Sequence, residues 1–97
     1  MTEITLRRDW DRYEVVASGH AVGFPEVCAA VSTLIFSLDA FIHNTPILLI
    51  QERLEPGDAL LQFSGGKEAE DAFDFVTLGF LMLQDQYPDV IQVYVAD

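Results

Sequence analysis

The chain has 97 residues, of which 51% are hydrophobic, so it is long enough to bury one core and too short for two. Sixteen acidic residues against five basic ones give a formal net charge of −11, which disfavours direct binding to nucleic acid or to an anionic membrane. A single cysteine excludes an internal disulfide, and we find neither a secretory signal nor a membrane-length apolar run. We therefore expect one cytoplasmic domain over residues 1–97.

The first half of the chain has the pattern of a hairpin followed by a helix. Residues 2–8 and 13–18 alternate between polar and apolar side chains on either side of a turn at 9–12. Pro25 suits the first position of a helix, and apolar residues then recur at helical spacing until Asn44-Thr45-Pro46 ends the pattern. These signals predict two strands and one long helix.

The second half repeats this order and adds a strand. Residues 47–54 and 58–64 predict a hairpin around the turn Glu55-Pro56-Gly57, residues 67–87 predict a second long helix, and residues 90–95 predict a last strand. The order ββαββαβ predicts an α+β fold, a two-layer sandwich in which two long helices cover one face of one sheet. The strand order stays open, and the central connections allow some strand pairs to be parallel.

The chain's one cysteine lies about one turn into the first predicted helix. Backbone N–H groups and the positive end of the helix dipole favour a thiolate at Cys28. At ~100° per residue, Cys28 lies at the edge of the apolar face, and Ser32 follows one turn later on the same line. His20 closes the preceding strand, so both side chains are expected at the same end of the two layers. A neutral imidazole there would accept the thiol proton, and backbone N–H groups of residues 27–29 would hold an oxyanion.

Structural interpretations of the same residues also exist. A lone cysteine in an apolar helix is usually a small buried side chain, and a histidine after glycine is usually a turn residue. One cysteine and two histidines, with His43 about a helix length from Cys28, make a poor zinc set, so we expect no metal and interpret His43 as a helix-ending residue beside Asn44. Gly65-Gly66 lacks the spacing of a phosphate-binding loop, so no nucleotide cofactor is expected.

Two separate patches of the sequence resemble one family. Gly19-His20-Ala21, followed by residues 27–32 (VCAAVS), resembles the signature of the ribosomal-processing cysteine proteases, called Prp. Residues 78–84, followed by Tyr87 and the strand at 90–93, resemble the last third of family members. The resemblance implies the same ββαββαβ fold and a cysteine endopeptidase that removes a short N-terminal extension from a bacterial large-subunit ribosomal protein.

The resemblance also implies roles for individual residues. Cys28 would be the nucleophile and His20 its general base, with Gly19, Ala21 and Ser32 as supporting motif positions and no cofactor. Many members place an aspartate shortly before the cysteine and have a longer, mobile loop after the histidine. Here Pro25 stands at the aspartate position, so Glu26 is the expected replacement acid, and the short loop is expected to be ordered.

Partners follow from charge and from the family. The net negative charge favours a basic partner such as a ribosomal extension, and the alternative interpretation is that this charge only keeps the protein soluble. The resemblance implies a homodimer, and the helix at 67–87 has more apolar side chains than one buried stripe needs. Two other functions stay open: an acidic binding module or chaperone that holds a ribosomal protein without cutting it, and a small structural domain in which Cys28 is merely packed.

Overall fold

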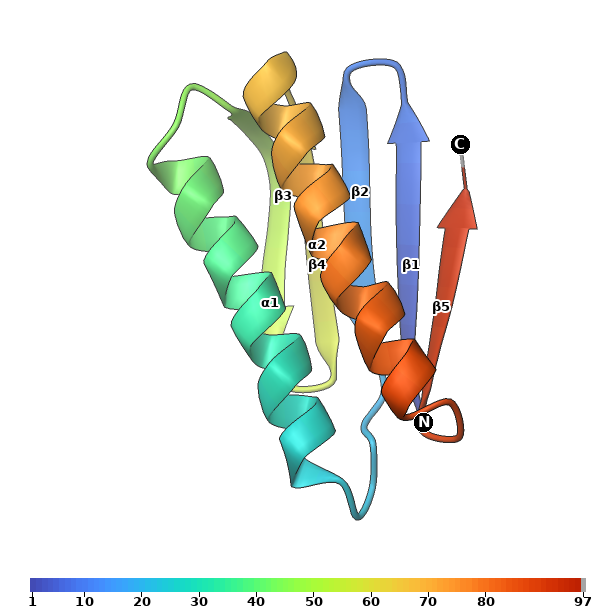
Figure 1. Cartoon of the computed structure of the whole chain (residues 1–97). Coiled ribbons are helices and arrows are strands. Elements are labelled where there is room, and N and C mark those ends of the chain that lie inside the picture. The colour runs from blue at the N-terminus through green and yellow to red at the C-terminus, as the bar shows by residue number, and fades with distance from the viewer. Residues whose placement is uncertain (97) are drawn as a thin grey trace.

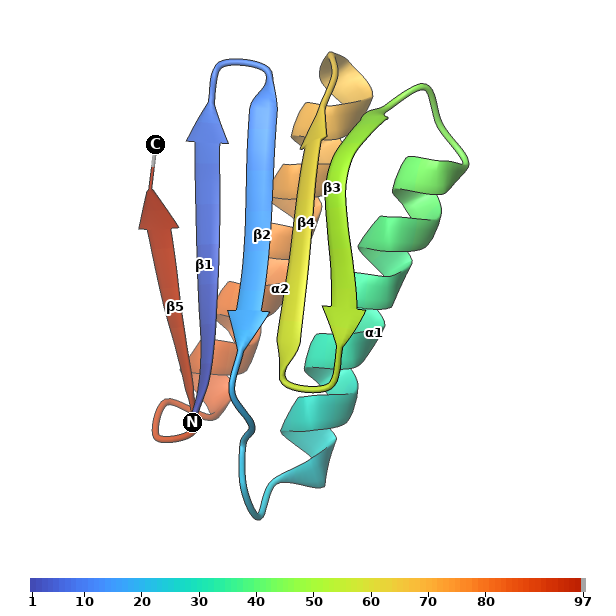
Figure 2. The same cartoon turned by 180° about the vertical axis from the view of Figure 1, so that it is seen from behind.

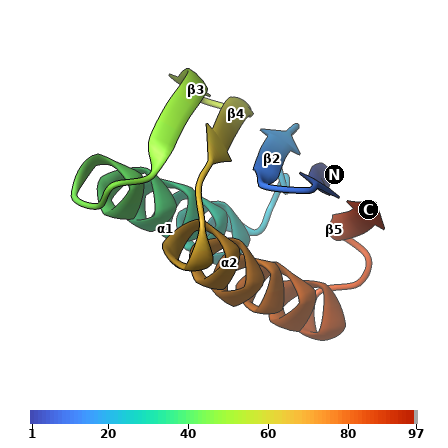
Figure 3. The same ribbon diagram turned by 90° about the horizontal axis from the view of Figure 1, so that it is seen from above.

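The computed structural model describes residues 1–96 and contains a five-stranded sheet with two helices on one of its faces (Figures 1 and 3). The observed order ββαββαβ confirms the predicted α+β class, and the predicted boundaries differ from the observed ones by single residues. The elements are β1 (Thr2–Asp9), β2 (Arg12–Ser18), α1 (Pro25–His43), β3 (Leu48–Glu55), β4 (Asp58–Ser64), α2 (Lys67–Gln86) and β5 (Ile91–Ala96).

The strand order, which the sequence left open, is β3-β4-β2-β1-β5. The two hairpins are antiparallel, and they join through an antiparallel pairing of β2 with β4. β5 pairs in parallel with β1, with Thr2 opposite Ile91, because α2 carries the chain back along the whole sheet before β5 begins. Within residues 1–96, the opposite face of the sheet carries no helix (Figure 2).

The core lies between the sheet and the two helices. The strands place alternate apolar side chains on the covered face, as the period of two requires, and each helix adds one buried stripe. The largest fully buried side chains come from all the strands except the edge strand β3 and from both helices: Phe63, Phe80, Ile4, Leu6, Ile42, Leu61, Ile91, Val15 and Val27.

Helix α1 begins and ends as the sequence predicts. Pro25 occupies its first turn, and Asn44 follows its last residue and donates from its side chain to the carbonyl of Ala40 at 2.7 Å. One expectation was wrong: the 19 residues of α1 are long and apolar enough to cross a membrane by length and composition. One side of α1 is buried against the sheet, while Phe36 and Phe41 on the same helix are exposed.

Candidate active site

A cavity of about 310 Å³ opens where the end of β2, the first half of α1 and the β3–β4 turn converge. These three segments meet at the lower end of the molecule in Figure 2. The structure thus brings together several residues that the sequence singled out. The residues that line the cavity include Gly19, His20, Cys28, Ser32, Glu55 and Asp58.

Cys28 lies in the first turns of α1 and is half-buried against the core. Its Sγ atom is 3.9 Å from the carbonyl oxygen of Ala21, a weak contact for a thiol donor. Its position at the edge of the core agrees with the helical spacing, and the thiol borders the cavity. Cys28 is therefore placed where a substrate carbonyl in the cavity can reach it.

His20 is exposed, and its imidazole lies against the β3–β4 turn. A Cβ atom built on Gly57 would lie 2.3 Å from Nε2 of His20, so the ring rests on the bare Cα of this glycine. The backbone here is fixed by two hydrogen bonds of 2.9 Å, from Gly19 N–H to the Gly57 carbonyl and from the Met1 nitrogen to the His20 carbonyl. Within residues 1–96, no hydrogen bond joins His20 to Cys28.

Of the other predicted site residues, Gly19, Ala21 and Ser32 lie beside His20 or on the cavity wall, and Glu26 does not. Gly19 has φ +85°, and a Cβ there would lie 2.3 Å from the carbonyl oxygen of Met1, so this position requires glycine. Ala21 is buried, and Ser32 is exposed on the cavity wall. Glu26 is exposed in the first turn of α1 and is not part of the cavity lining, so the structure does not bring this acid to the cysteine and histidine.

The loop between His20 and Cys28 is held at several points. The N–H of Phe24 donates to the carbonyl of Ala21 at 3.0 Å, and the ring of Phe24 meets the ring of Tyr87 edge-on, with centroids 6.2 Å apart. Tyr87 follows the second patch of sequence resemblance, so that part of the chain contacts the loop between the two segments of the first patch. These contacts support the expectation of an ordered loop.

The proposed oxyanion donors near the start of α1 are already occupied. The N–H groups of Val27 and Cys28 both donate to the carbonyl of Phe24, at 3.1 and 3.3 Å. An oxyanion would have to displace Phe24 from these groups. Two of the expected oxyanion donors at residues 27–29 therefore already form hydrogen bonds to Phe24, the residue that caps the start of α1.

Carboxylates dominate the charge around the cavity. Glu55 and Asp58 both line it, from the two sides of the β3–β4 turn. Arg53 donates two hydrogen bonds of 3.0 Å to Asp58, which raises the pKa of Arg53 above its ordinary value. Because Arg53 largely neutralises Asp58, the negative charge of the cavity comes mainly from Glu55, and this charge favours a cationic ligand.

Comparison with known proteins finds similarity in structure. No family model matches the chain, and none of the curated protein sequences matches it. Prp from Staphylococcus aureus in complex with a covalently linked product peptide has a TM-score of 0.83 at 18% identity, over 98% of this chain and 99% of that chain. Prp from the same organism with a substrate peptide has a TM-score of 0.76 at 15% identity, over 98% and 99%. SMU.848 from Streptococcus mutans has a TM-score of 0.77 at 23% identity, over 100% of this chain and 96% of that chain.

The protein therefore has the fold of the ribosomal processing protease Prp along its described length. This confirms the fold that the two sequence patches implied. At identities of 23% or less, the structural likeness establishes the fold, and the chemistry has to be argued from the cavity itself.

Proposed function

We propose that the protein is a cysteine endopeptidase that removes a short N-terminal extension from a bacterial large-subunit ribosomal protein. The observation that carries this proposal is the position of Cys28 and His20 on one cavity, in a fold shared with Prp structures that hold peptides. Gly19 and Ala21 fix the chain on either side of His20, which gives the supporting motif positions a physical role.

In the proposed reaction, His20 takes the proton of the Cys28 thiol, and the thiolate attacks the carbonyl carbon of the scissile bond. The tetrahedral intermediate collapses to a thioester as His20 gives its proton to the leaving amine. Water, deprotonated by His20, then hydrolyses the thioester and restores the thiol. Because His20 is exposed and rests on Gly57, its ring must rotate toward Cys28 when the substrate binds.

The charges of the protein support a basic substrate. Glu55 and Asp58 lie on the cavity wall, and the whole chain carries a net charge of −11. A cationic extension would be attracted at long range and held close to these carboxylates. This attraction should weaken with salt, since exposed charges are screened over about 8 Å at physiological ionic strength.

The test is cleavage of a bacterial large-subunit ribosomal protein that carries such an extension, followed by mass spectrometry. The same ribosomal protein without the extension is the substrate control, and Cys28→Ala is the enzyme control. We expect one cut, at the end of the extension, with the unaltered protein only. Cleavage by Cys28→Ala, or no cleavage of any extension-bearing protein, would overturn the proposal.

Two observations favour a second function, an acidic module that binds or chaperones a ribosomal protein without cutting it. The His20 ring rests on Gly57 rather than on the thiol, and Glu26 lies outside the cavity in the position after Pro25. Tight binding of the extension by the unaltered protein, without turnover, distinguishes this function from the protease.

We also propose that the protein is a cytoplasmic homodimer. Its single half-buried thiol suits a reducing compartment. Helix α2 buries Phe73, Val76 and Phe80, yet a second stripe on the same helix is exposed. Phe75, Leu78 and Met82 are 77%, 60% and 64% exposed. An apolar stripe of this kind on a small domain is typical of a surface that pairs with another chain.

A further inference from the structure

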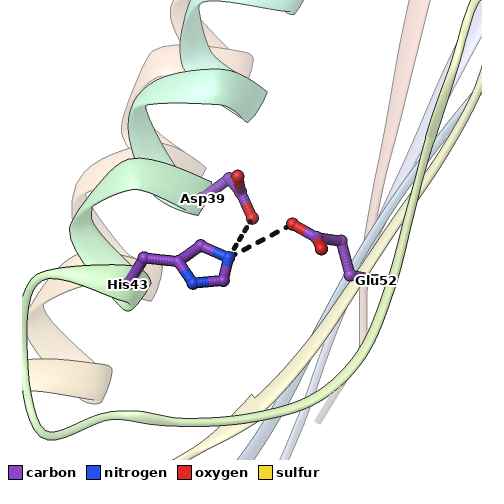
Figure 4. Close-up of side chains that lie close together, drawn as sticks. All are labelled: Asp39, His43 and Glu52. Carbon is purple, nitrogen blue, oxygen red and sulfur yellow. Dashed lines mark hydrogen bonds and ion pairs between the residues drawn. The ribbon is translucent and has the colours of Figure 1, made fainter.

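A second cluster of polar side chains lies toward the far end of α1 from Cys28. Asp39 and His43 are one turn apart on this helix, and Glu52 reaches them from the edge strand β3 (Figure 4). Nε2 of His43 is 3.4 Å from Oδ1 of Asp39 and 3.4 Å from Oε1 of Glu52. All three donor atoms lie within 4.8 Å of one another.

The two separations of 3.4 Å match the geometry of a bound transition metal. Zn²⁺ holds imidazole nitrogen and carboxylate oxygen at about 2.0–2.1 Å in a tetrahedron, and neighbouring donors in such a tetrahedron are about 3.4 Å apart. Both distances from the His43 nitrogen equal this value. Figure 4 shows the carboxylates of Asp39 and Glu52 directed at the same nitrogen of the His43 ring, so the three donor groups lie around one small space.

Asp39 gives an independent indication of a missing ligand. Its Oδ1 atom is buried and points into the cluster, where Nε2 of His43 lies 3.4 Å away, a long distance for a hydrogen bond. The neighbouring cation on β3, Arg53, is bonded to Asp58 instead. A buried carboxylate oxygen held by one long contact is costly, and a cation at the centre of the cluster would satisfy it better.

We propose that Asp39, His43 and Glu52 bind one Zn²⁺ ion that fastens the end of α1 to the edge strand β3. The side chains of His43 and Glu52 are 52% and 34% exposed, so water can fill the fourth position. Counting cysteines and histidines predicts no zinc set, because two of the three donors are carboxylates. The site is separate from the peptide cavity, since Asp39 lies about 16 Å along α1 from Cys28.

The experiment measures thermal unfolding of the untagged protein with EDTA, with Zn²⁺ and with Mg²⁺. Every variant also carries Cys28→Ser, which removes the thiol as a zinc ligand. Asp39→Asn keeps the shape of the side chain but removes its charge. Asp85→Asn is the matched control, because it makes the same change in the last turn of α2, at the other end of the helical layer.

At a Zn²⁺ concentration about 100 times the dissociation constant, we expect the melting temperature to rise by about 10 °C or more. Asp85→Asn should keep this rise, and both Asp39→Asn and His43→Gln should lose most of it. Titration calorimetry should give one ion per chain. An equal rise in Asp39→Asn and Asp85→Asn, an equal rise with Mg²⁺, or no rise in the parent would each overturn the proposal.

Discussion

The imidazole of His20 rests on Gly57, so closely that a methyl group at residue 57 would lie 2.3 Å from Nε2. Gly57 also has φ +70°, a backbone conformation that alanine adopts only with strain. We therefore predict that Gly57→Ala lowers the free energy of unfolding by about 1–2 kcal/mol and displaces the His20 ring, with a loss of cleavage. Denaturant unfolding and kcat/KM measure the two effects.

Gly23→Ala separates these two effects. Gly23 has φ +85°, but a Cβ atom there would meet nothing within 4 Å. This variant should carry a similar backbone cost without touching His20, so it should retain more of the cleavage rate than Gly57→Ala. If both variants lose the same share of kcat/KM, the contact between His20 and Gly57 has no role in catalysis.

His20→Ala should reduce kcat/KM by about 10²–10⁴, the usual contribution of a general base. The side chain is exposed, so the free energy of unfolding should change little. Steady-state cleavage and denaturant unfolding, measured on the same preparation, test this. A loss of less than tenfold would show that another group accepts the thiol proton.

The order of the elements was predictable because its signals act over a few residues: alternation in the strands, Pro25 at a helix start and the turn at Pro56-Gly57. The strand order was not predictable from the sequence, because it depends on which strand edges pair in the folded domain. The parallel pairing of Thr2 with Ile91 joins residues from the two ends of the chain. No local pattern specifies such a contact.

The same distinction applies to the site. The shared cavity of His20 and Cys28 follows from a strand end and a helix start that adjoin each other. The contact of the His20 ring with Gly57 arises from the pairing of β2 with β4, which places Ser18 opposite Asp58. The spacing of Asp39 and His43 along α1 is visible in the sequence, but the approach of Glu52 depends on how α1 packs on β3 and was not predictable from it.

Assembly can be tested on the exposed stripe of α2. Phe75→Lys places a charge in this apolar surface, so we predict that the parent is a dimer at micromolar concentration and that this variant is a monomer. Trp10→Lys is the control, because Trp10 is 91% exposed in the β1–β2 turn. Sedimentation velocity measures whether the parent and each variant are monomers or dimers. A monomeric parent, or dissociation caused by Trp10→Lys alone, would contradict a dimer through α2.

Asp39 should make the stability of the metal-free protein depend on pH. Burial, together with hydrogen bonding and repulsion from Glu52, raises the pKa of Asp39 from 3.8 to about 6, while His43 opposes this shift. Because the folded state holds the proton more tightly, ionised Asp39 destabilises the fold above pH about 6, and the penalty is relieved as the pH falls toward 4. Hydrogen bonding with Asp39 lowers the pKa of Glu52, which offsets part of the penalty.

In EDTA at pH 8, Asp39→Asn should therefore have a larger free energy of unfolding than the parent, and the difference should shrink between pH 6 and pH 5. Urea unfolding across this range measures it. A variant that is less stable than the parent at pH 8 would show that the ionised carboxylate stabilises the fold. If Asp39→Asn is at least as stable as the parent, the loss of its zinc response cannot be due to unfolding.

Cys28 as the nucleophile is the central claim, and trapping the acyl-enzyme tests it most directly. The protein is mixed with excess extension-bearing ribosomal protein, quenched in acid within one turnover and analysed by intact mass and peptide mapping. We predict an adduct on Cys28 that adds the mass of the extension peptide less one water, joined as a thioester through the C-terminal carbonyl of the extension, and none in Cys28→Ser. Cleavage that proceeds without this adduct and continues in Cys28→Ser would contradict the account.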